Sequence, residues 1–162
     1  MNMKLNSKNY GTDNMITFDS RNLNQEAWAE RARAEAILIH GKDSTRRNRS
    51  LEEIYETTKY GHAAEQYLIE EFGFEDDPRI YKDVINTSGD PVEVKVTENE
   101  NNVIYVLKRC NEAAKEKWRK FPKKLMIFVS PRSGTTYHLH GYYEYNGKEF
   151  KKTSVQIPQS IV

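Results

Sequence analysis

The dipeptide Asn146-Gly147 constrains the fold of this chain more than any other feature, because it is the strongest short hairpin signal in the sequence. A second turn signal, at 87–90, separates two further segments with strand character. The expected strands are 80–86, 91–97, 125–130, 135–145 and 148–157. A chain with this many short strands must form a sheet, and the sheet needs helices to cover its apolar surface.

Three segments with helical periodicity supply that cover. The first runs over 24–40, with Ala27, Ala34 and Leu38 on one face and Trp28, Ala32 and Ile39 beside them, and Gly41 is its expected end. The other two begin at capping boxes, Ser50 with Glu53 and Thr97 with Glu100, and end at Phe72 and before Pro122. The order helix, helix, two or three strands, helix, strand, hairpin predicts an α/β or α+β sandwich around a small mixed sheet.

Length and composition set the limits of the domain. The 162 residues suit one domain, expected over 24–162 with a mobile N-terminal arm over 1–23. No apolar run reaches the roughly 18 residues of a membrane helix, and the polar N-terminus does not resemble a signal peptide, so we expect a cytoplasmic protein without a membrane partner. The single cysteine, Cys110, excludes an internal disulfide and argues against a Cys-rich zinc site.

Acidic side chains provide the chemical signal. Glu93 and Lys95 are two apart on an expected strand and so share a face, and Asp83 lies on the partner strand across the turn. Glu65 falls on the apolar, inward stripe of the second helix, where a carboxylate is costly unless something pairs with it. Clustered carboxylates of this kind repel one another unless a hard divalent cation such as Mg²⁺ neutralises them. A lysine beside such an ion can hold a water or a phosphate, which suits hydrolysis of a phosphodiester.

These residues resemble the active-site pattern of the PD-(D/E)XK nuclease superfamily, over residues 50–130. The resemblance implies a restriction-endonuclease-like αβββαβ core with a mixed central sheet flanked by helices, extended by the N-terminal helix and the hairpin at 135–157. It implies that Asp83 and Glu93 coordinate Mg²⁺ (Mn²⁺ as a substitute) with the Val94 carbonyl, that Glu65 completes the metal site and that Lys95 positions the attacking water. Lys82 stands where that family's pattern begins with proline.

A second Glu-x-Lys, Glu149-Phe150-Lys151, fails the wider pattern because no aspartate follows Asp90. The net charge of +1 conceals basic segments that an acid-rich stretch at 65–77 offsets. The side chains that we expect to contact nucleic acid are Arg46, Arg47, Arg49, Lys115, Arg119, Lys120, Lys123, Arg132, His138 and His140.

The resulting hypothesis is a Mg²⁺-dependent endodeoxyribonuclease that acts on DNA, as a homodimer if it cuts both strands. Two alternatives stay open: a non-catalytic DNA-binding or assembly module on the same scaffold, and a nuclease acting on RNA. His138 and His140 alternate on one strand face and could bind a metal, but without a third ligand nearby a structural or DNA-contacting role is favoured. His62, one turn before Glu65, either supports the site or is simply packed.

Overall fold

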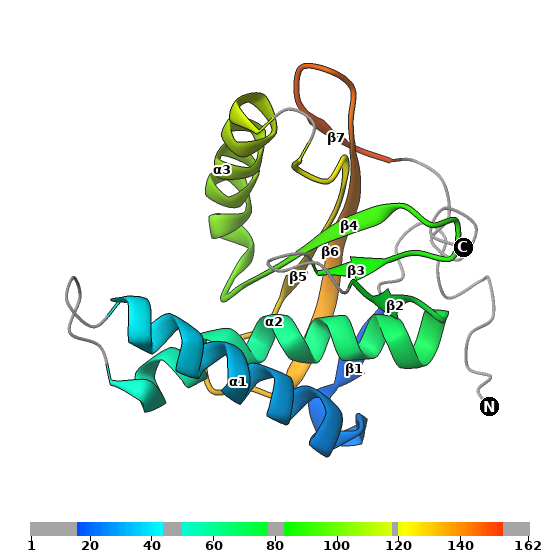
Figure 1. The fold of residues 1–162 in the computed structure, drawn as a ribbon. Helices are drawn as coiled ribbons and strands as arrows, with labels where there is room; N and C mark the ends of the chain where they lie inside the picture. Colours follow the sequence, from blue (N-terminus) through cyan, green and yellow to red (C-terminus); the bar gives the residue numbers. More distant parts are fainter. Residues whose placement is uncertain (1–15, 44–49, 78–82, 118–119, 154–162) are drawn as a thin grey trace.

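The computed structural model describes residues 16–43, 50–77, 83–117 and 120–153, and these residues form a mixed α+β fold (Figure 1). Three helices accompany a curled seven-stranded sheet. The helices are α1 (Gln25–Asp43), α2 (Leu51–Phe72) and α3 (Val103–Glu116). The strands are β1 (Thr17–Asp19), β2 (Glu75–Asp76), β3 (Val84–Ile85), β4 (Pro91–Thr97), β5 (Lys124–Val129), β6 (Thr136–Tyr145) and β7 (Phe150–Lys152).

The strands lie in the order β1-β6-β5-β4-β3-β2, and β7 also pairs with β6. β4 and β5 are parallel and are connected through α3, whereas the other pairs are antiparallel. A parallel pair needs a crossover connection of this length, so α3 is the element that makes the sheet mixed.

Side-chain alternation along the central strands sorts the core into two apolar clusters on opposite faces. On one face, α2 packs against the cluster that contains Val92, Val94, Met126 and Phe128, and α1 packs along α2 (Figure 1). On the other face, α3 packs with its buried residues against strand side chains. The members of this second cluster are Val103, Val106, Cys110, Ala114, Leu125, Ile127, Val129, Tyr143 and Phe150.

The first helix differs from its prediction in length and in part of its buried face. It continues through Gly41 to Asp43, and its buried residues are Trp28, Ala32 and Ala36, spaced four apart. Leu38, expected on the apolar face, is 63% exposed. Alanine at this spacing lets α1 lie close against α2, so proximity to the neighbouring helix decided the face rather than side-chain size.

The capping boxes had opposite outcomes. The Ser50 hydroxyl accepts from the Glu53 N–H at 3.1 Å and the Glu53 carboxylate accepts from the Ser50 N–H at 2.8 Å, so the first box is confirmed. The predicted box at Thr97 and Glu100 is wrong, because Thr97 is the last residue of β4 and a 3₁₀ turn (Glu100–Asn102) leads into α3. That helix ends at Glu116, well before Pro122.

Strand predictions hold best where the apolar pattern is long. β4 has the predicted bounds, and β5 is displaced by one residue. β2 was not predicted, and β3 is described only over Val84–Ile85, while 80–82 lie outside the described residues. The terminal hairpin forms, with Gly147 at a φ of 97°, and its second strand is described as far as Lys152.

The mobile arm predicted over 1–23 needs correction at its end. Residues Thr17–Asp19 form β1, which pairs with β6, and Ile16 is buried. Phe18 stacks on both Tyr67 and Tyr137, with ring centroids 4.1 and 4.6 Å apart. Aromatic packing therefore docks this segment, which carries no sustained period in sequence.

Candidate active site

The β3–β4 hairpin positions two of the predicted catalytic carboxylates. The Asn86 side chain accepts from the N–H groups of Ser88 and Asp90, and Gly89 supplies the positive φ of 89° that the turn requires. The register pairs Val84 with Val92, and extending it by one pair places Asp83 opposite Glu93.

Asp83 lies immediately before β3 and is fixed by the returning strand. Its Oδ2 accepts from the Val94 N–H at 2.6 Å. Val94 and Val92 point into the core on the α2 side, so the alternate residues Glu93 and Lys95 share the other face of β4. The Lys95 Nζ lies 3.2 Å from Glu93 Oε2, and the Glu93 side chain is only 13% exposed. The structure therefore brings Asp83, Glu93 and Lys95 together.

Glu65 joins them from α2. It is 6% exposed, as its position on the inward stripe predicts, and its carboxyl group lies close enough to that of Asp83 for each to influence the other's pKa. Two neighbouring carboxylates repel each other unless a proton or a cation reduces their charge.

The electrostatics agree with that arrangement. Burial, followed by the charges of Glu65 and Glu93, raises the pKa of Asp83 well above its usual range. Burial also raises the pKa of Glu65, against the opposing effects of His62, Arg31 and Asp83. The site concentrates negative charge beyond what its neighbours compensate, as functional sites commonly do.

One cation of the site is held charged. Burial would lower the pKa of Lys95, but the carboxylate of Glu93 and the further acids nearby raise it above its ordinary value. An ammonium group therefore stands beside the carboxylates, where it can attract a phosphate or hold a water.

Two residues outside the predicted catalytic set complete the surroundings of Glu65. His62 Nδ1 lies 3.4 Å from Glu65 Oε1, and His62 Nε2 lies 2.5 Å from Glu35 Oε1 on α1. Burial would lower the pKa of His62, but the nearby carboxyl groups of Glu35 and Glu65 raise it to about 9. Sequence reasoning noted His62 and missed Glu35, whose only signal was its place on a helix expected to pack nearby.

A metal ion at this site would have few protein ligands. No group of three or more His, Cys, Asp or Glu side chains within the described residues is arranged to hold a metal ion. Mg²⁺ needs only one or two carboxylates and keeps several waters, and the side-chain donors here are carboxylate oxygens. Their chemistry, taken one or two at a time from Asp83, Glu93 and Glu65, therefore fits a hard, largely hydrated divalent ion.

The predicted nucleic-acid contacts are scattered. Arg46, Arg47, Arg49 and Arg119 lie outside the described residues. Lys120 is exposed, and Lys123 is half-buried, with its Nζ donating to the Phe121 carbonyl at 2.9 Å. Arg132 is 83% exposed and pairs with Glu98 at 2.9 Å.

His138 and His140 share a face, as their alternation predicts. Each ring contacts one carboxylate oxygen of Glu100, at 2.7 Å, and so ties β6 to the turn that precedes α3. This contact gives the pair a structural role in the described chain, and the expectation of a nucleic-acid contact stays a prediction.

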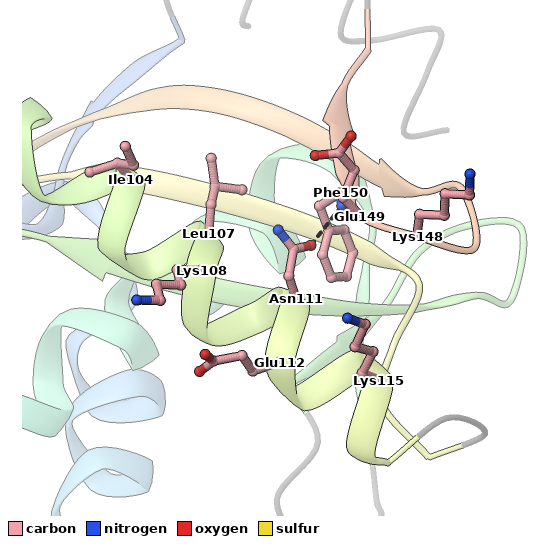
Figure 2. A pocket seen from close by; sticks show the side chains of 9 residues that line it. All are labelled: Ile104, Leu107, Lys108, Asn111, Glu112, Lys115, Lys148, Glu149 and Phe150. Carbon is pink, nitrogen blue, oxygen red and sulfur yellow. Dashed lines mark hydrogen bonds between the residues drawn. The ribbon is translucent and has the colours of Figure 1, made fainter.

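A groove lies away from the acidic site, between α3 and the β6–β7 hairpin (Figure 2). It has a volume of about 450 Å³ and includes Lys115, one of the predicted nucleic-acid contacts. The Phe150 N–H donates to Asn111 Oδ1 at 2.7 Å, which ties the hairpin to the helix at the groove floor. Its full lining is Ile104, Leu107, Lys108, Asn111, Glu112, Lys115, Lys148, Glu149 and Phe150. The second Glu-x-Lys thus borders this groove and not the carboxylate cluster.

Comparison with protein-family models, with curated proteins and with solved structures yields no match to this chain. In the described part of the chain, no helix combines the length and apolar character needed to cross a membrane.

Proposed function

We propose that this protein is a divalent-metal-dependent nuclease of the PD-(D/E)XK type, which hydrolyses phosphodiester bonds in DNA. The observation that carries the proposal is the convergence of the buried Glu65 carboxyl group on Asp83, with Glu93 and Lys95 beside them. Neighbouring acids whose repulsion raises the pKa of Asp83 are suited to bind a divalent cation, which would relieve that repulsion.

The topology supports the same reading. Helix α2 is followed by the antiparallel strands β2, β3 and β4, then by α3 and by β5, which runs parallel to β4. The restriction-endonuclease-like core that we propose has its elements in this same αβββαβ order. Helix α1, β1 and the β6–β7 hairpin are additions to it.

Each residue has a distinct part in the proposed reaction. Asp83, Glu93 and the Val94 carbonyl would hold Mg²⁺, and Glu65 would complete the site. The bound ion would lower the pKa of a water and stabilise negative charge on the phosphate. The Val94 N–H keeps the Asp83 carboxylate in place through its 2.6 Å hydrogen bond. Lys95 positions the attacking water beside the scissile phosphate and contributes a compact positive charge there.

The test is cleavage of supercoiled plasmid and of single-stranded DNA with Mg²⁺, comparing wild type with D83A and K95A. We expect each variant to lose about 100-fold or more in rate, because each removes a group that acts on the reacting phosphate or its metal. K151A is the matched control, since Lys151 belongs to the other Glu-x-Lys and lies 3.5 Å from Glu149 on the surface.

Three results would decide against this proposal or narrow it. Unchanged cleavage by D83A and K95A would refute the site. Salt-dependent DNA binding without turnover in wild type would favour the non-catalytic module. Faster cleavage of RNA than of DNA under the same conditions would change the substrate class and keep the site.

A further inference from the structure

Glu35 approaches the candidate site from a helix that is not part of the αβββαβ core. It lies on α1, and its Oε1 contacts His62 Nε2 at 2.5 Å. The other ring nitrogen of His62 faces Glu65 Oε1 at 3.4 Å. A line of three side chains therefore runs from α1 through His62 to a carboxylate of the candidate metal site.

The geometry leaves His62 few alternative positions. Its side chain is 15% exposed, and the one close hydrogen bond that fixes its ring comes from Glu35. Nδ1 is buried and has no hydrogen bond of normal length, so the ring faces Glu65 without closing on it. If the Glu35 contact were lost, the ring could rotate and Glu65 would lose its imidazole neighbour.

We propose that Glu35 is a positioning residue of the candidate site, which holds His62 so that the imidazole orients the Glu65 carboxylate toward the metal. This inference rests on the proposed metal-dependent function and adds a role for α1 in it. Partners that orient metal-binding side chains from outside the coordination sphere commonly change metal affinity by about 10- to 100-fold when removed.

The same helix pair supplies a matched control. Glu52 on α2 pairs with Arg33 on α1 at 3.1 Å, and both side chains are well exposed. E52A, like E35A, removes one glutamate and one ion pair between α1 and α2. A purely structural role for Glu35 in docking the helices would therefore be mimicked by E52A.

The experiment titrates Mg²⁺ and Mn²⁺ into each protein by calorimetry and, in parallel, measures the metal concentration that gives half-maximal DNA cleavage. We expect E35A and H62A to weaken metal binding by about tenfold and E35Q, which keeps an acceptor oxygen, to weaken it less. E52A should bind metal as wild type does. The double variant E35A/H62A should bind no more weakly than H62A alone, because both act through one contact.

The outcomes separate this inference from the proposed function. Glu35 does not position the site if E35A binds metal as tightly as E52A does, or if the losses in metal affinity of E35A and H62A add in the double variant. Either result would leave the nuclease assignment intact. If wild type neither binds metal nor cleaves nucleic acid, the proposed function fails first. Circular dichroism and thermal midpoints of each variant check that the fold is intact.

Discussion

The two faces of the sheet are covered by layers that differ in how much charge they bury. The layer that contains α1 and α2 carries Glu35, His62 and Glu65 between helices and sheet, together with the half-buried Arg31. On the α3 side the core cluster is apolar and aromatic, and the charged residues on that face of β4, Glu93 and Lys95, are more exposed than Glu65. Burying charge costs stability that apolar packing would not. The α2 side, where Glu65 lies near Asp83, is therefore a place where buried charge costs stability.

The largest expected effect tests the apolar layer. Ile127 is fully buried between β4, β6 and the α3 side of the core. I127A should lower the free energy of unfolding by about 3 kcal/mol, through lost transfer energy and the cavity left behind. Urea unfolding should give the same loss at pH 6 and pH 9, and with Mg²⁺ or with EDTA. A loss that depends on pH or metal would mean that the two layers are not energetically separate.

His62 should behave differently, because its contribution depends on protonation. Its pKa is raised from 6.5 to about 9 in the folded protein, so the stabilisation is complete below pH 6.5 and is lost as pH rises through about 9. H62Q should therefore cost about 1–3 kcal/mol more at pH 6 than at pH 10. Urea unfolding across this range measures the difference.

H140Q is the comparison for H62Q. His140 contacts Glu100, which is 54% exposed, so solvent screens that ion pair. A pH dependence in H140Q as large as that in H62Q would show that burial between α1 and α2 adds nothing to the His62 contacts.

The smallest expected effect is an increase in the free energy of unfolding, caused by substitution of Asp83. Because the pKa of Asp83 is raised in the folded state, its charged form costs stability that grows as pH rises above the unfolded value near 3.8. We expect the free energy of unfolding of D83N to be about 1 kcal/mol higher than that of wild type at pH 7 in EDTA, because the substitution removes the charge. The amide oxygen can still accept from the Val94 N–H. With Mg²⁺ the order should reverse, because only wild type gains stability from the ion.

The control for D83N is D90N, at the tip of the same hairpin. The Asp90 carboxylate is 52% exposed and lies 3.9 Å from Lys124, so its neutralisation should change stability little in either buffer. If D83N is less stable than D90N in EDTA, the charge of Asp83 does not cost the stability that we assign to it.

Local signals predicted the elements that depend on local chemistry. Ser50 with Glu53, the Asn146-Gly147 turn and the apolar run of β5 each stabilise their own element within a few residues. The short strands β1 and β2 were not predicted, because three and two residues carry no periodicity and are held by distant partners. The buried face of α1 was misassigned for the same reason, since α2 decides which side is covered.

By itself the sequence determined which residues could make a carboxylate site: Glu65 on an inward helical stripe, Asp83 across a turn from Glu93, and Lys95 two residues on. Alternation and register follow from backbone geometry, so these relations are readable from spacing. Only the tertiary structure decided that Glu65 lies near Asp83, that Glu35 contacts His62 from α1, and that His138 and His140 meet Glu100. Those contacts join segments far apart in the chain, and the packing of whole elements, rather than local spacing, brings them within reach.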